Sequence, residues 1–225
     1  MRHAATTSII ALALALAAAS HPARADDAMI AAGRALAANG VMAERPGCAS
    51  CHMQNGAGQP DVGIPRLAGL TEQQIATQLT YFATGARQSP AMAPSARQLS
   101  PAQRQQAAAY FASLPIPPQP DPLASPAASR TRGKDLYLNG DQRTGLIACA
   151  QCHGTTALGV GEFSPRLAGQ SASYVEEQLR AWRKGAVRDP LGAFMRAEAG
   201  GMSLEDINAV AAYVASLGHT ETQAP

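Results

Sequence analysis

Large side chains are scarce in this sequence. Aromatic residues make up 4% of its 225 residues and there is a single tryptophan, whereas glycine and proline number 20 and 16. Small domains built mainly from alanine, glycine and proline have weak hydrophobic cores on their own. The composition therefore suggests that something other than protein side chains fills the centre of the fold.

Charge is also sparse and evenly divided between the two signs. Charged residues make up 15% of the chain and the formal net charge is +2. No stretch forms a basic arm or an acidic tail, so nucleic acid binding has no electrostatic basis here. We expect no nucleic acid among the partners of this protein.

Long apolar runs are missing except at the N-terminus. Residues 4–19 are apolar, follow Arg2 and His3, and precede the small-x-small site Ala23-Arg24-Ala25. That order is typical of a secretory signal peptide, and the run is shorter than the ~20 residues of a membrane-spanning helix. We predict that residues 1–25 are a signal peptide and that the mature protein lies in the periplasm. Its 16 basic residues would then balance its 16 acidic ones.

The rest of the sequence repeats with a period of about one hundred residues. The segment PRLAG occurs at 65–69 and again at 165–169, and AAYFASL at 108–114 corresponds to AAYVASL at 211–217. Coincidences of this kind in one order indicate a duplicated domain.

A proline-rich segment separates the two copies. Five of the eight residues from 115 to 122 are proline, which favours an extended, semi-rigid chain. We predict one domain over residues 26–114, a linker over 115–128 and a second domain over 129–225.

Each copy is predicted to be all-helical, because no convincing alternating strand pattern occurs. Thr71, Ser100, Ser171 and Ser203 are expected to cap helix N-termini. The helices are expected at 27–39, 71–84 and 101–113 in the first copy and at 131–139, 171–184 and 204–216 in the second.

All four cysteines fall into two C-x-x-C-H motifs, at residues 48–52 and 149–153. This pattern is the signature of covalent c-type haem attachment. Cysteines at i and i+3 lie on one face of a helical turn, where both sulfurs can form thioethers with the haem vinyl groups. The next residue, a histidine, then projects its imidazole at the iron. We predict two covalently bound haem c groups, attached through Cys48, Cys51, Cys149 and Cys152, with His52 and His153 as axial iron ligands.

Other uses of a C-x-x-C pair fit less well. Structural zinc sites usually draw their ligand pairs from closer positions in the chain, and a thioredoxin-like redox motif needs a βαβ context. Structural disulfides are compatible with the periplasm, but they would not explain a histidine directly after each pair.

The second axial ligand is predicted to be methionine. No cysteine is left over, and the mature chain has one further histidine, His219, near its end. In the first copy Met53 is adjacent to the proximal histidine, on the wrong side, and Met92 is the only later methionine. In the second copy Met195 stands eight residues before Ser203, as Met92 stands eight before Ser100, whereas Met202 aligns with a core leucine. Met92 and Met195 are therefore the expected ligands.

The ordered set of motifs resembles the dihaem cytochromes c of the cytochrome c4 type, which consist of two class I cytochrome c domains. The resemblance covers nearly the whole mature chain. It implies that the first and last helices of each domain cross at Gly33 and Gly133, with Tyr110 and Tyr213 packed nearby. One departure is Met53, which stands where the family, and this chain's own second copy at Gly154, has glycine.

The resemblance also implies roles around the haems. The carbonyls of Pro65 and Pro165 would accept hydrogen bonds from the proximal histidines and raise their basicity. Arg66 and Arg166 would pair with haem propionates, and Trp182 would lie near one of them.

Iron bound by both histidine and methionine has no open position for substrate, so we expect an electron carrier and not an enzyme. The first expectation is a shuttle from a quinol-oxidising complex or a dehydrogenase to a terminal oxidase or another cytochrome, with peripheral membrane association through those partners. An alternative is a dedicated cytochrome subunit of a periplasmic dehydrogenase, which an exposed apolar patch would favour. A third is a dihaem enzyme such as a peroxidase.

Overall fold

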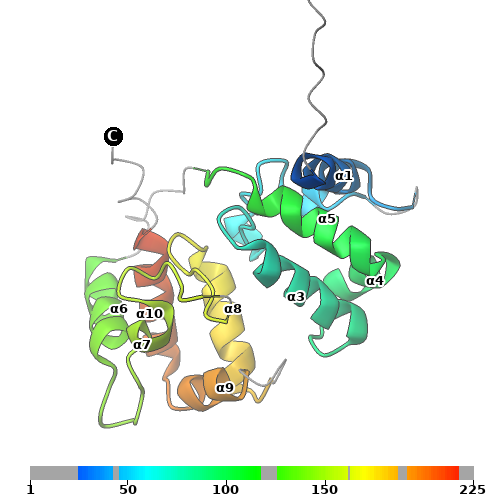
Figure 1. The fold of residues 1–225 in the computed structure, drawn as a ribbon. Coiled ribbons are helices and arrows are strands. Elements are labelled where there is room, and N and C mark those ends of the chain that lie inside the picture. Colours follow the sequence, from blue (N-terminus) through cyan, green and yellow to red (C-terminus); the bar gives the residue numbers. More distant parts are fainter. Residues whose placement is uncertain (1–24, 43–45, 118–125, 162, 187–191, 218–225) are drawn as a thin grey trace, which may run out of the picture.

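The computed structural model describes residues 25–42, 46–117, 126–161, 163–186 and 192–217. The predicted signal peptide except its last residue, Ala25, most of the proline-rich linker and His219 lie outside these residues. Figure 1 shows two helical units side by side, the first in blue to green and the second in green to red.

All regular elements of the described residues are helices, joined by loops that contain isolated β-bridges. The first domain contains α1 (Ala25–Asn39), α2 (Ala49–His52), the short 3-10 helix η1 (Pro60–Val62), α3 (Glu72–Thr84), α4 (Met92–Gln98) and α5 (Pro101–Ala112). The second contains α6 (Ala127–Asn139), α7 (Ala150–His153), α8 (Ala172–Arg183), α9 (Gly192–Gly200) and α10 (Leu204–Ser216). The five α-helices of one domain correspond in order to those of the other, which confirms the tandem all-α fold.

Local capping explains where the helices begin. The side chains of Thr71 and Ser100 each accept a hydrogen bond from the backbone N–H of the glutamine three residues on. The side-chain Oε1 of that glutamine in turn accepts from the backbone N–H of Thr71 or Ser100, so both helices begin with a capping box. Ser171 and Ser203 accept in the same way from Tyr174 and Asp206. All four predicted caps are confirmed.

The first and last helices of each domain cross at a glycine, as the family resemblance implies. A Cβ atom on Gly33 of α1 would lie 1.9 Å from the Gln106 carbonyl oxygen of α5, and one on Gly133 of α6 would lie 1.9 Å from that of Ala209 in α10. The Cβ atoms of Tyr110 and Tyr213 are the next neighbours. Only glycine allows the two backbones to approach so closely.

The helix before each final helix was not predicted. The sequence predicts no helix around Met92 or Met195, yet Met92 begins α4 and Met195 lies within α9. Pro94 obscures the first of these helices in the sequence, although proline is tolerated in a first helical turn, where no intrahelical N–H bond is lost. A second difference is α6, which begins at Ala127 and not at residue 131.

The core of each domain is built from few large side chains. In the first, the buried cluster is Ala37, Ala49, Ile75, Ala76, Ala108, Tyr110 and Phe111. In the second, Leu136, Tyr137 and Ile207 are fully buried, in one cluster with Met202 and Tyr213. Two core tyrosines form hydrogen bonds to the backbone just after the C-x-x-C-H motifs. The Tyr110 hydroxyl donates to the Gln54 carbonyl and the Tyr137 hydroxyl to the Gly154 carbonyl, both at 2.8 Å.

Candidate haem sites

The two C-x-x-C-H motifs fold into the same single helical turn. The N–H of His52 donates to the carbonyl of Cys48, and that of His153 to Cys149, both at 2.9 Å. The first cysteine of each motif is half-buried and the second is exposed, and no disulfide joins any of these four described cysteines. The predicted attachment residues are therefore presented in matching geometry in both domains.

Each motif histidine is held in one orientation by a proline carbonyl. Nδ1 of His52 lies 3.0 Å from the Pro65 oxygen, and Nδ1 of His153 lies 3.0 Å from the Pro165 oxygen. A carbonyl only accepts, so Nδ1 donates and Nε2 keeps its lone pair for a metal. Burial lowers the pKa of both imidazoles, opposed by the bond to proline, and a lowered pKa favours the neutral ring that iron requires.

Burial has the opposite effect on the first cysteine of each motif. It raises the pKa of the Cys48 thiol, and it raises that of Cys149 to about 11. Catalytic and redox cysteines need a lowered pKa, so these thiols do not have the character of a thioredoxin-like pair. Within the described residues there is also no group of three or more His, Cys, Asp or Glu side chains that could hold a metal ion.

The two predicted methionine ligands occupy corresponding elements. Met92 is half-buried at the start of α4, where its N–H donates to Ser89 Oγ at 3.1 Å. Met195 is half-buried in α9 and packs against the same core cluster as Cys149 and Trp182. Met202 is a buried member of that cluster, only 4% exposed, as expected of a core position.

Met53 adopts a backbone conformation suited to glycine. Its φ is 64° and its ψ is 156°, close to the 77° and 155° of the equivalent Gly154. A side chain in this region costs on the order of 1–3 kcal/mol. The departure noticed in the sequence is therefore a local strain directly after the first motif.

We expect Met53→Gly to stabilise the holoprotein by about 1 kcal/mol, because relief of strain exceeds the added flexibility of the unfolded chain. Guanidinium unfolding followed by circular dichroism measures this change. The reverse substitution in the second domain, Gly154→Met, should destabilise it. A lower stability of Met53→Gly would show that position 53 is not strained.

Arg66 lies at the contact between the domains, a placement that the sequence did not reveal. Its side chain is fully buried and donates to the carbonyls of Ala68, Ala168 and Gly169. Desolvation, reinforced by the nearby Arg166 charge, lowers the pKa of Arg66 to about 10, so it remains a cation at neutral pH. Pairing of these two arginines with haem propionates stays a prediction.

Further polar contacts join the domains. Arg87, after α3, donates to the Tyr174 hydroxyl at 2.9 Å and to Gln178 Oε1 at 2.8 Å, both in α8. Ser173 at the start of α8 donates to the Pro60 carbonyl of η1. The hydrogen bonds between the two domains are thus made by α8 and by the residues directly before it, Ala168, Gly169 and Gln170.

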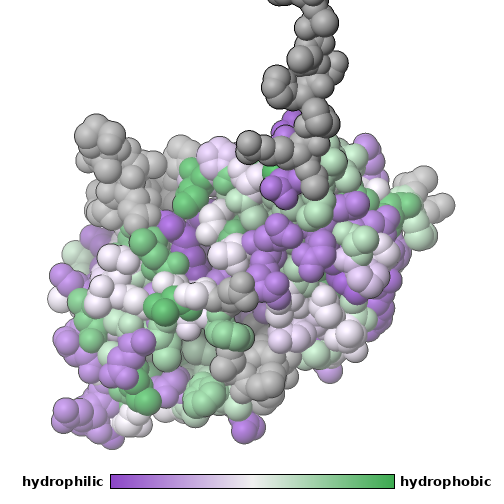
Figure 2. Space-filling model, in the orientation of Figure 1, coloured by the Kyte–Doolittle hydropathy of each residue, from purple (hydrophilic) through white to green (hydrophobic). Residues whose placement is uncertain are grey.

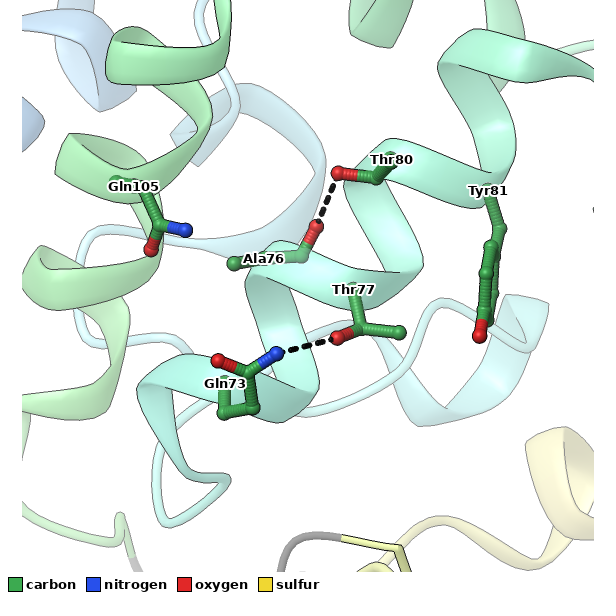
Figure 3. A pocket seen from close by; sticks show the side chains of 6 residues that line it. All are labelled: Gln73, Ala76, Thr77, Thr80, Tyr81 and Gln105. Carbon is green, nitrogen blue, oxygen red and sulfur yellow. Dashed lines mark hydrogen bonds between the residues drawn. The ribbon is translucent and has the colours of Figure 1, made fainter.

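A groove lies between α3 and α5, and no residue of either motif lines it (Figure 3). It is lined by Gln73, Ala76, Thr77, Thr80, Tyr81 and Gln105. Gln73 Nε2 donates to Thr77 Oγ1 at 3.0 Å and Thr80 Oγ1 to the Ala76 carbonyl at 2.9 Å, so these polar groups are engaged within α3. The groove offers no arrangement of nucleophile and base.

The site residues fit haem c. Each domain presents two cysteine sulfurs and an imidazole with free Nε2 on one turn, and a half-buried thioether on a later helix. Soft sulfur and imidazole nitrogen are the donors that haem iron takes in electron carriers. Fold and site together define a protein of two covalent-haem domains whose function is electron transfer.

Comparison with known proteins agrees. The family described as cytochrome c matches residues 30–115 and 131–218. A thiosulfate dehydrogenase electron acceptor of Thiomonas intermedia (strain K12) is 47% identical over 150 residues, covering 66% of this chain and 69% of that protein. A cytochrome c4 of Thiocapsa roseopersicina is 37% identical over 187 residues, covering 80% and 88%. The solved structure of thiosulfate dehydrogenase (TsdBA) from Marichromatium purpuratum superposes with a TM-score of 0.74 at 38% identity, and the match covers 83% of this chain and 40% of that one.

The chain belongs to the cytochrome c family. It is a dihaem cytochrome c that carries electrons and is not an enzyme, and its relatives are cytochromes c4 and electron acceptors of thiosulfate dehydrogenase. Within the described residues, no helix has the length and apolar character needed to cross a membrane.

Proposed function

We propose that this cytochrome is the dedicated electron acceptor of a thiosulfate-oxidising dehydrogenase in the periplasm. The support is its likeness to a named thiosulfate dehydrogenase electron acceptor and to 40% of the solved TsdBA chain. The general respiratory shuttle, expected first from the sequence, is less well supported than the dedicated partner expected as the alternative. Residues 1–25 would direct export.

The assignment of residues follows the geometry of the two motifs. Cys48, Cys51, Cys149 and Cys152 would hold the haems, and His52 and His153 would bind iron through Nε2, with the proline carbonyls fixing each ring. Met92 and Met195 would be the second iron ligands, from α4 and α9. The bound haems would supply reversible one-electron chemistry.

Exposed apolar side chains on the second domain favour a lasting partner. Phe163 and Phe194 are 79% and 69% exposed, and Ile147, Leu158 and Val160 are also exposed. We call these five residues the domain-2 apolar surface. On the face shown in Figure 2, hydrophobic residues lie exposed over the domain of α6–α10.

This surface flanks the second haem motif. The N–H of Ile147, two residues before Cys149, donates to Glu198 Oε2 of α9 at 2.9 Å, and Phe194 lies one turn before Glu198 on the same helix face. A Cβ atom on Gly154, the residue after His153, would meet Val160 at 3.9 Å. The first domain has smaller or polar residues at most equivalent positions, among them Ala57, Gln59 and Ala91.

The test is reduction of the purified holoprotein by thiosulfate and a thiosulfate-oxidising dehydrogenase, followed at the haem absorption bands. Phe163→Ser with Phe194→Ser should slow this reduction about tenfold or more, since buried aromatic anchors dominate interface energies. Val62→Ser in the first domain, at a side chain 67% exposed, is the matched control and should not slow it. Reduction by ascorbate should be equal in all three proteins.

Two results would count against the proposal. If ascorbate reduces the holoprotein and the dehydrogenase with thiosulfate does not, the proposed function is wrong. Equal reduction rates for the double variant and the wild type would instead show that the dehydrogenase docks on another surface of the cytochrome.

A further inference from the structure

A single peptide group connects the first proximal histidine to the other domain. The carbonyl of Pro65 accepts from His52 Nδ1 at 3.0 Å, and the N–H of the same peptide, on Arg66, donates to Gln170 Oε1 at 3.0 Å. Gln170 directly follows the second PRLAG segment, in the second domain. The hydrogen bonds therefore run from His52 through one rigid peptide plane to Gln170.

Gln170 is held firmly in this position. Its Nε2 donates to the Arg66 carbonyl at 3.0 Å, and its Oε1 also accepts from the Ser171 N–H at 3.0 Å. The side chain is 4% exposed, so water does not compete for these bonds. The orientation of the amide is fixed, because only Oε1 can accept from an N–H and only Nε2 can donate to a carbonyl.

The first domain has a different residue at the position equivalent to Gln170. The residue equivalent to Gln170 is Leu70, whose side chain has no hydrogen-bonding atom. Leu70 therefore cannot act on the Pro165–Arg166 peptide as Gln170 acts on Pro65–Arg66. The two histidine–proline hydrogen bonds are both 3.0 Å long. They differ in the residue that the opposite domain places at the equivalent position, which is Gln170 for the Pro65–Arg66 peptide and Leu70 for the Pro165–Arg166 peptide.

We propose that Gln170 is a positioning residue that tunes the iron–His52 bond from the opposite domain. Accepting the peptide N–H polarises the Pro65 carbonyl, since linked hydrogen bonds strengthen one another. A stronger acceptor at Nδ1 makes His52 a more basic ligand, and a more basic ligand favours ferric iron. Gln170 thus lowers the reduction potential of the first haem relative to the same site without it. The inference rests on the proposed assignment of His52 as an iron ligand.

The experiment compares Gln170→Leu with wild-type holoprotein in a spectroelectrochemical titration, with each haem assigned by NMR. We expect the first haem to become easier to reduce, so that the equilibrium constant for electron transfer from the second haem to the first rises by about two- to tenfold. The second haem should not change. The Nδ1–H resonance of His52 should move, and that of His153 should stay.

Matched variants separate tuning from a loosened interface. Gln178→Leu removes another buried interface glutamine, which contacts Arg87 and not the Pro65–Arg66 peptide, and should leave both potentials unchanged. Gln170→Glu keeps an acceptor for the Arg66 N–H and should leave the first haem no easier to reduce than in the wild type. It also provides the test if Gln170→Leu does not fold.

The proposal is overturned if Gln170→Leu shifts neither haem or shifts both equally, if Gln178→Leu has the same effect, or if Gln170→Glu makes the first haem easier to reduce. A His52 ring without the paramagnetic shift of an iron ligand in the oxidised protein would instead reject the ligand assignment. The two failures are therefore distinguishable.

Discussion

Gly133→Ala is expected to destabilise the second domain by about 3 kcal/mol, the upper part of the usual range for overpacking. The added Cβ would lie 1.9 Å from the Ala209 carbonyl oxygen and 2.9 Å from Tyr213 Cβ. Neither is the far end of a flexible side chain, so α10 as a whole would have to move away from α6. That movement would disturb the main helix contact of the domain.

Gly200→Ala is the matched control for this substitution. Gly200 ends α9, and an added Cβ there meets nothing within 4 Å. Alanine has the higher helix propensity, so this variant should be unchanged or more stable by up to about 1 kcal/mol. Guanidinium unfolding of the holoproteins measures both changes, and equal midpoints for Gly133→Ala and wild type would contradict the close crossing.

Met195→His is expected to lower the potential of the second haem by on the order of 0.2 V, a fraction of the ~0.8 V range that axial ligands set. Thioether sulfur is a soft, weak donor that favours ferrous iron, whereas a second imidazole favours ferric iron. The near-infrared band of methionine-ligated ferric haem should lose half its intensity, because one of two such haems changes its ligand.

Met202→Leu is the control for the methionine assignment. Met202 is buried in the core cluster of the second domain, and a volume-conserving exchange there should cost less than about 1.5 kcal/mol and leave the potential unchanged. A near-infrared band that halves in Met202→Leu and persists in Met195→His would reverse the assignment.

Features governed by short-range rules could be predicted from the sequence. Thr71 and Ser100 begin helices because hydroxyl caps act within three residues, and Gly33 and Gly133 stand out because the repeat places a glycine at the same point twice. The C-x-x-C-H spacing likewise fixes its own geometry, since all its residues lie within one turn.

Features that depend on the meeting of the two domains could not be predicted. Arg66 and Arg166 belong to identical PRLAG segments. The neighbouring sequence therefore does not indicate that Arg66 is buried and donates hydrogen bonds to carbonyls of the other domain. Gln170 and Leu70 differ visibly in the sequence, but their difference gains meaning only once α8 lies against the first domain. Helices α4 and α9 were missed because both are short.

Two covalent haems on each chain can be counted by intact mass spectrometry under denaturing conditions. Mature protein from a host that attaches haem to C-x-x-C-H motifs should retain the mass of two haems, and Cys149→Ala with Cys152→Ala should retain one. A wild-type chain that keeps one haem or none after denaturation would contradict the account.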